Sequence, residues 1–169
     1  MENNVENKTE LKNRLINFYI FHKKKIIVLV IILLIISISL ALLKYKIEKN
    51  NKLIAEKYVQ AGIYLTSNKT NDAKIIFEEI ILSKNRFYSI LALNTVIEKK
   101  LITDKNKILE YFEILEKINL NEENKDLVLL KKALYLISNA DEINGKALLK
   151  NIIDKNSNLK PIAQELINK

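Results

Sequence analysis

The stretch from Tyr58 to Ser83, YVQAGIYLTSNKTNDAKIIFEEIILS, places apolar stripes with helical spacing on either side of a short polar segment. The stripes consist of Ile54, Tyr58, Ala61 and Leu65 before the segment, and of Ala73, Ile76, Phe77 and Ile80 after it. Residues spaced three and four positions apart lie on one face of an α-helix, where they can be buried together. Because the polar segment is short, the pattern predicts two antiparallel helices, 47–66 and 70–83.

The same spacing continues to the end of the chain. It predicts five further helices, over 86–99, 104–118, 122–138, 142–154 and 159–168. The connections carry residues that favour helix starts, namely Thr70 or Asn71, Thr103 or Asp104, Asn119 or Asn121, Asn139 or Asp141, and Pro161 in the first turn of the last helix. Only two glycines and one proline occur, which argues against a turn-rich β fold. The chain is therefore expected to be all-α, with about seven helices in a run of α-hairpins.

Small residues recur at matching places in alternate helices, and a small residue on each partner lets two helices cross closely. The residues predicted to pack at such crossings are Ala61, Gly62, Ala73, Phe77, Ala92, Ala133, Ala147 and Pro161. The units 58–83 and 133–161 each resemble a tetratricopeptide repeat, which usually has about 34 residues. The middle unit, 86–118, keeps only Ala92. The resemblance implies a degenerate tetratricopeptide-like array.

A second feature is the apolar stretch in HKKKIIVLVIILLIISISLALLKYK, residues 22–46. The uncharged run from Ile26 to Leu43 would make a helix of roughly 27 Å, close to the hydrocarbon thickness of a bilayer. The alternative is a buried core helix, but soluble helices of this length usually keep a polar face. The long region before the run and the lack of an A-x-A-like site favour an uncleaved transmembrane anchor over a signal peptide.

The charge on either side of the anchor gives an expectation for its orientation. Residues 8–25 hold six Lys and Arg, and residues 44–60 hold five. Positive charge is retained in the cytoplasm, so the basic leader 1–25 is expected there and the domain 44–169 outside it. The reverse orientation, with a cytoplasmic domain, is the alternative.

The composition indicates binding rather than chemistry. The net charge is +8, but the lysines alternate with Glu and Asp and form no Arg-rich stripe, so nucleic acid is not an expected partner. There is no cysteine, and His22 is the only histidine. The carboxylate pairs Glu78–Glu79 and Glu122–Glu123 fit solvated helix faces better than an acid–base pair, because adjacent helical residues point in different directions. No phosphate-binding glycine loop or nucleophile motif occurs. We therefore expect a non-enzymatic protein with no catalytic residues, cofactor or metal.

Tyrosines are the candidates for a partner surface. Tyr58, Tyr88 and Tyr111 fall within apolar stripes and are expected to pack between hairpins. Tyr64 and Tyr135 fall less clearly within the stripes, so they are the predicted partner-contacting residues.

The order of features resembles the YfgM-like family of ancillary subunits of the bacterial SecYEG translocon. The resemblance is carried by the leader ELKNRLINFYIFHKKK, the anchor behind it and the stretch SKNRFYSILALNTV, residues 83–96, and it weakens after Leu101. It implies a single-pass inner-membrane protein with a periplasmic helical domain. Its partners would be translocon subunits and a membrane-anchored periplasmic chaperone. The alternative function is a structural envelope scaffold for cell-division or cell-wall machinery.

Overall fold

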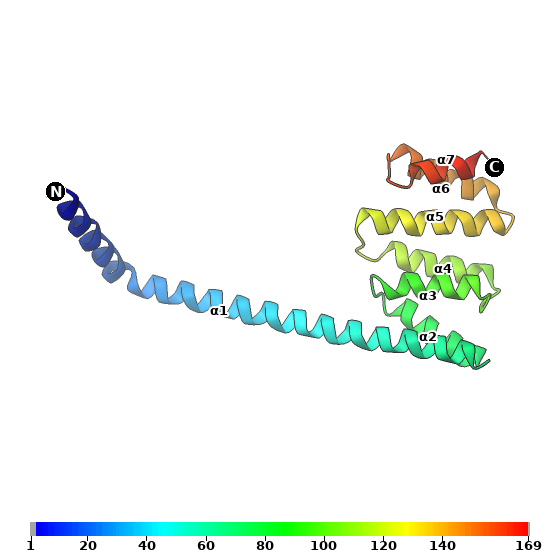
Figure 1. Cartoon of the computed structure of the whole chain (residues 1–169), viewed down its shortest axis with the longest axis horizontal. Coiled ribbons are helices and arrows are strands. Elements are labelled where there is room, and N and C mark those ends of the chain that lie inside the picture. Colours follow the sequence, from blue (N-terminus) through cyan, green and yellow to red (C-terminus); the bar gives the residue numbers. More distant parts are fainter. Residues whose placement is uncertain (1–2, 169) are drawn as a thin grey trace. The chain divides into compact units, whose positions relative to one another are not determined.

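The computed structural model describes residues 3–168, with side chains described for 12–14 and 16–168, and over this range the chain is all-α with no strand (Figure 1). The helices are α1 (Asn3–Thr66), α2 (Thr70–Leu82), α3 (Tyr88–Glu98), α4 (Lys105–Glu116), α5 (Glu122–Ser138), α6 (Glu142–Asp154) and α7 (Lys160–Ile167). The prediction of an all-α chain is confirmed over these residues, and the predicted anchor helix and about seven domain helices form seven helices in all, because the anchor and the first domain helix are continuous in α1. Met1, Glu2 and Lys169, at the ends of the predicted leader and domain, lie outside the described residues.

Contacts divide the chain into two compact units, residues 1–50 and 51–169. The first unit consists of the N-terminal part of α1. Its helix does not end after the apolar run, although separate helices over 26–43 and 47–66 are predicted. The reason is that residues 44–53, KYKIEKNNKL, contain neither glycine nor proline and so nothing that stops a helix.

The apolar run in the first unit is exposed from Ile27 to Leu43, and Ile26 is half-buried. Its end residue Leu43 is 58% exposed, and none of the most apolar window is buried. The Ser39 hydroxyl donates to the carbonyl oxygen of Ile35 at 2.8 Å, which satisfies this polar group within the helix. The described chain thus holds one helix long and apolar enough to span a membrane, and it is not a buried core helix.

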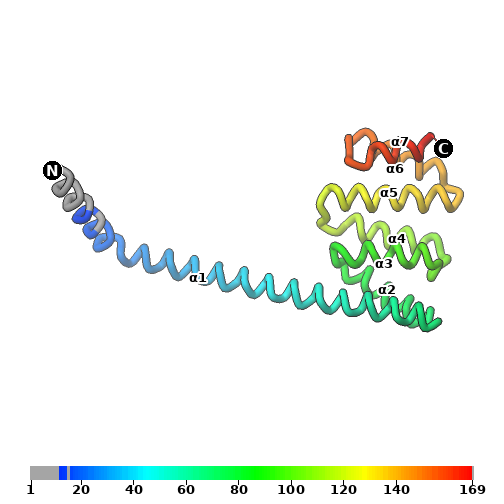
Figure 2. Tube along the Cα trace, in the orientation of Figure 1, coloured from blue at the N-terminus to red at the C-terminus, as the bar shows by residue number. Residues whose placement is uncertain are grey.

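In the second unit the chain runs back and forth, so that successive helices stack beside one another (Figure 2). Helix α2 packs on α3, α5 packs on both α4 and α6, and α6 packs on α7. The buried apolar side chains form two clusters. The first extends from Ile54 to Val128 and includes Phe77 and Phe112. The second joins α5, α6 and α7 through Leu130, Ala133, Leu149, Ile152 and Ala163. Helix α5 therefore contributes to both clusters.

The predicted packing residues have different outcomes. Ala61, Ala73, Phe77, Ala92 and Ala133 are all buried. Pro161 lies in the first turn of α7, as predicted, but it is exposed, so its predicted part in the packing is wrong.

Two further packing predictions, for Ala147 and Gly62, are also wrong. Ala147 is exposed, and the close crossing of α5 and α6 occurs at Gly145 instead. A Cβ atom at Gly145 would lie 2.8 Å from the carbonyl oxygen of Ala133 and 2.5 Å from Cγ1 of Ile137. Gly62 has open space where its Cβ would lie, so it is not at a close crossing.

The helix starts follow the predicted capping residues in part. Asp104 accepts from the backbone N–H groups of Asn106 and Lys107, and Asn121 accepts from that of Asn124. Asp141 is at the N-cap of α6 but makes no capping bond to the backbone. The prediction of Thr70 or Asn71 as the cap of α2 is wrong, because the N-cap of this helix is Lys69. The N–H of Lys69 also closes the end of α1 by donating to the carbonyl of Tyr64 at 2.8 Å, so the turn leaves no room for a separate cap.

Five helices end in a residue with left-handed backbone conformation, and none of these residues is glycine. They are Asn68, Lys84, Lys100, Ala140 and Asn156, with φ between 51° and 60°. After α5, the N–H of Asp141 reaches back to the carbonyl of Leu136 at 2.9 Å, which completes a Schellman-type end with Ala140 in the left-handed position.

Replacing Ala140 by glycine is expected to stabilise the protein by about 0.5–1 kcal/mol, because the Cβ of alanine is unfavourable in this conformation. Thermal unfolding followed by circular dichroism would measure this as a higher melting temperature. Ala147→Gly is the matched control, since Ala147 is an exposed residue inside α6. This variant should be less stable by a similar amount, because glycine is unfavourable within a helix. Equal effects of the two changes would contradict the assigned turn.

Candidate functional site: a groove between α3 and α5

Two adjoining hollows lie between the C-terminal halves of α3 and α5. Each has a volume of about 360–390 Å³, and they share Ile97, Tyr135 and Ser138. The first is completed by Asn94, Glu98, Lys131 and Leu134, and the second by Lys100, Ile102, Thr103 and Asn139. We call the two together the α3–α5 groove.

The groove has apolar side chains from both helices. Leu134 is 40% exposed, which is unusual for a leucine with a core on both sides of its helix. Tyr135 is half-buried, and its ring lies 5.9 Å from that of Phe112, measured between centroids. Burial raises the pKa of the Tyr135 hydroxyl, and the charge of Asp104 raises it further. The ring is thus held by the core while the residue lines the groove.

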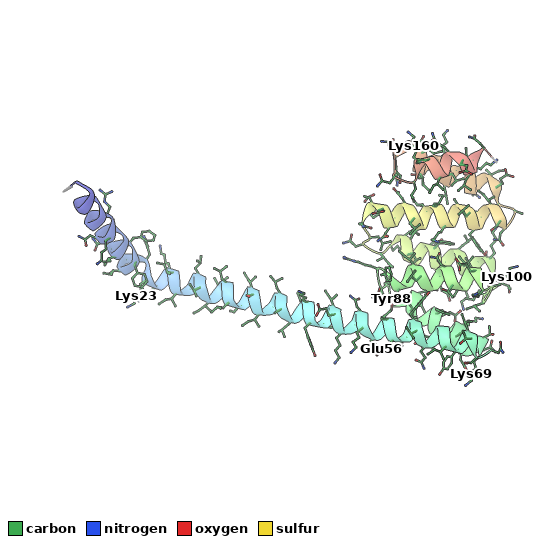
Figure 3. All side chains as sticks on the ribbon, viewed as in Figure 1. Lys23, Glu56, Lys69, Tyr88, Lys100 and Lys160 are labelled. Carbon is green, nitrogen blue, oxygen red and sulfur yellow. The ribbon has the colours of Figure 1, made fainter. Side chains whose placement is uncertain are left out.

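Charged groups at the groove are left without ion pairs. Among the described residues, no salt bridge involves Lys100, Lys131 or Glu98. Lys100 is at the left-handed end of α3 (Figure 3), where its backbone turn directs the chain into the α3–α4 connection. An apolar floor with two unpaired lysines and one unpaired glutamate suits a polypeptide with both apolar and charged side chains.

The predicted partner residues separate into two places. Tyr135 lines the groove, as the prediction of a partner surface requires. Tyr64 does not. Its hydroxyl accepts from Nε2 of Gln60 at 3.2 Å, the ammonium of Lys69 lies 5.6 Å from its ring centroid, and it packs against the first cluster. Tyr64 is therefore occupied by local contacts at the end of α1.

The three tyrosines of the apolar stripes, Tyr58, Tyr88 and Tyr111, pack between hairpins as predicted. The ring of Tyr58 lies 5.6 Å from that of Phe77 and 5.8 Å from that of Tyr88, measured between centroids. Its hydroxyl is 3.1 Å from that of Thr95, which connects α1 to α3. Tyr111 is buried in the first cluster.

The sequence patterns do not identify the other groove residues, among them Ile97, Leu134, Lys100 and Lys131. Their helices are apolar on most sides, so periodicity alone does not show which apolar side chain remains exposed. The only sequence signal is the pair Leu134–Tyr135, where two large side chains follow a buried alanine.

Glu78 is not on a solvated face, in contrast to the prediction, although Glu79 is exposed and pairs with Lys57. The hydroxyl of Tyr111 donates to Oε1 of Glu78 at 3.1 Å, and the ammonium of Lys107 pairs with the same oxygen at 2.5 Å. The hydrogen bond to Glu78 raises the pKa of Lys107, and burial raises the pKa of Tyr111. This cluster joins α2 to α4.

These two raised pKa values predict a loss of stability in alkali. The folded protein holds the protons of Tyr111 and Lys107 more tightly than the unfolded chain does. Their contribution is therefore present below the ordinary values of 10.0 and 10.5 and is lost as the pH rises above them. The melting temperature of the original protein should fall as the pH is raised from 8 to 11. The melting temperature of Tyr111→Phe should fall less over the same range, although this variant should be less stable by about 1 kcal/mol at neutral pH because it lacks the hydrogen bond. An identical alkaline decrease in both proteins would contradict the assignment.

The described residues contain no group of three or more His, Cys, Asp or Glu side chains placed to hold a metal ion. His22 is half-buried between the rings of Phe18 and Phe21, at centroid distances of 4.7 and 5.3 Å. Comparison with known proteins found no matching family, no matching curated protein and no matching solved structure.

Proposed function

We propose that this protein is a membrane-anchored, non-enzymatic module that binds other polypeptides in the α3–α5 groove. The observation that carries the proposal is the combination of exposed Leu134, half-buried Tyr135 and the unpaired Lys100 and Lys131 along the two adjoining hollows of the groove. Aromatic and apolar anchors inside a charged rim are the usual composition of protein-binding surfaces. No cofactor or metal is part of the proposal.

The proposed anchor is the segment from Ile26 to Leu43. None of its most apolar window is buried within the protein, and contiguous exposed apolar surface of this size is unfavourable in water. Fifteen large aliphatic residues make insertion into a bilayer favourable by several kcal/mol, on the order of a few tenths each.

The proposed orientation places the basic leader in the cytoplasm and residues 44–169 in the periplasm of a bacterial inner membrane. It rests on the charge difference across the anchor and on the HKKK cluster, residues 22–25. A reporter that is active only outside the cytoplasm, fused after Lys169, tests it. Activity supports the orientation, and an inactive but intact fusion contradicts it.

The proposed architecture of the domain is a tetratricopeptide-like array of three hairpins, with α7 covering the end of the last one. The buried alanines Ala61, Ala92 and Ala133 lie on the first helix of each hairpin, which supports the proposal. The first helices α3 and α5 then form the walls of the groove. This would explain why the hollow follows alternate helices along the chain.

In the proposed setting, the protein is accessory to the Sec translocon and acts together with a membrane-anchored periplasmic chaperone. The anchor would raise the local concentration of the groove near emerging polypeptides, so weak binding would suffice. The alternative is a scaffold for cell-division or cell-wall machinery, which would use the same groove for a folded envelope partner. Binding of an unfolded polypeptide distinguishes the two functions, because it is expected of the translocon accessory and not of the scaffold.

The test is binding of a permanently unfolded polypeptide, reduced and carboxymethylated α-lactalbumin, to the full-length protein in nanodiscs. We expect saturable binding that Leu134→Lys weakens at least about tenfold, because it places a charge on the apolar floor. Ile143→Lys is the matched control, since Ile143 is 86% exposed on α6 and outside the groove. Equal affinity of both variants and the original protein would contradict binding in the groove.

A further inference from the structure

A second cavity lies between the first turns of α5 and the connection from α6 to α7. Its volume is about 390 Å³. It is lined by Glu122, Glu123, Asp126, Lys155, Asn156, Ser157, Asn158 and Leu159. Three of these side chains are carboxylates from one helix, and one is a lysine from the opposite wall.

Asp126 is the unusual member of this cavity. It is only 7% exposed, and its Oδ1 is buried without a hydrogen-bond partner, which holds for no other side-chain atom of the described residues. A buried carboxylate oxygen that accepts no hydrogen bond is strongly unfavourable unless a donor or cation reaches it. This side chain therefore points to a ligand group that the chain itself does not supply.

The position of Asp126 rules out helix capping as its purpose. The N-cap of α5 is Asn121, whose side chain already accepts from the N–H of Asn124. Glu122 and Glu123 lie in the first turn, where negative charge suits the positive end of the helix dipole. Asp126 lies one turn later, beyond the unsatisfied N–H groups of the helix start.

The neighbouring lysines do not satisfy Asp126. Lys125 pairs with Glu122 at 2.7 Å, and this contact lowers the pKa of the Glu122 carboxyl. Lys155 lines the cavity, and no salt bridge among the described residues includes it. The ammonium of Lys160 donates to Oδ1 of Asn156 at 3.2 Å, so this lysine is not bonded to Asp126 either.

We propose that this cavity binds the guanidinium or alkylammonium group of a ligand, with Asp126 as its main acceptor. Such groups carry several N–H donors and no acceptor, which matches a wall of carboxylate, amide and hydroxyl oxygens. A metal ion fits less well, because no three acidic side chains here are arranged as metal ligands. The group would belong either to a free amine or to an Arg or Lys side chain of a partner.

The experiment is calorimetric titration of the full-length protein in nanodiscs of zwitterionic lipid. The probes are agmatine, the peptide acetyl-Gly-Arg-Gly-amide, and the same peptide with citrulline, the neutral isostere of arginine. We expect saturable binding of agmatine, of the arginine peptide or of both, with no binding of the citrulline peptide. Binding of agmatine alone assigns the site to free amines, and binding of the peptide assigns it to a side chain of a partner.

Substitutions connect the binding to Asp126. Asp126→Asn should weaken binding at least about tenfold, because it removes a charge-assisted hydrogen bond. Glu110→Gln, the same chemical change at an exposed site on α4, should leave it unchanged. Lys155→Met should strengthen binding by removing a competing cation. The proposal would be overturned if neither cationic probe bound the original protein or Lys155→Met. It would also be overturned if the probes bound Asp126→Asn as tightly as the original protein. Neither result would bear on binding in the α3–α5 groove.

Discussion

Phe77→Ala is expected to lower the free energy of unfolding by about 3–5 kcal/mol, the cost of removing a large aromatic side chain from a closed core. Phe77 is 1% exposed in the first cluster, and its ring meets that of Tyr58 edge-on at 5.6 Å between centroids. Both the apolar burial and this ring contact are lost in the variant. Domains of this size have a free energy of unfolding of about 5–15 kcal/mol, so the loss would remove a large part of the stability of the folded state.

Urea unfolding of the full-length protein in detergent micelles, followed by circular dichroism at 222 nm, would measure the effect as a lower midpoint. Phe87→Ala is the matched control, because Phe87 is 61% exposed and the atoms removed are the same. Its effect should stay within about 0.5 kcal/mol, as for other surface changes. Similar midpoints for the two variants would contradict the assignment of Phe77 to the core.

The two glycines of the chain are expected to respond in opposite directions to the same change. Gly145→Ala should destabilise the protein by about 1–3 kcal/mol, because the added Cβ would overlap the carbonyl oxygen of Ala133 and force α5 and α6 apart. Gly62→Ala should stabilise it by about 0.5–1 kcal/mol, because the position is helical and its Cβ meets nothing within 4 Å.

Melting temperatures of the two variants measure this difference, and each variant serves as the control of the other. Helix propensity alone predicts that both alanines stabilise, so only the close approach of α5 and α6 explains a decrease at Gly145. Stabilisation in both variants would show that the two helices do not cross closely at Gly145.

Local features of the fold follow from the sequence. The apolar spacing located the helices of the domain, and the side chains of Asp104 and Asn121 located two helix starts. The buried alanines of alternate helices were also predictable, because a small residue within an apolar stripe has few other roles. Each of these features depends on a few residues that are close together in the sequence, so it can be predicted from the sequence alone.

Features that depend on how helices cross are not predictable in the same way. Gly145 and Ala147 are both small and lie two residues apart, and only the register of α6 on α5 decides which one meets Ala133. Likewise, Leu134 and Ile97 belong to helices that are apolar on most sides, so their place in the groove depends on the separation of α3 and α5. In the sequence Asp126 resembles any exposed acidic residue, because its burial depends on the α6–α7 connection, which is distant in the sequence.

The central claim is that an anchored helical domain binds polypeptides in the α3–α5 groove, and one measurement in native membranes tests it most directly. A photoreactive amino acid is placed at Leu134 of the full-length protein while an exported polypeptide is arrested during translocation. We predict a crosslink between position 134 and the arrested polypeptide, well above the level from the same amino acid at the exposed position 143. Equal or absent crosslinking from both positions would contradict the claim.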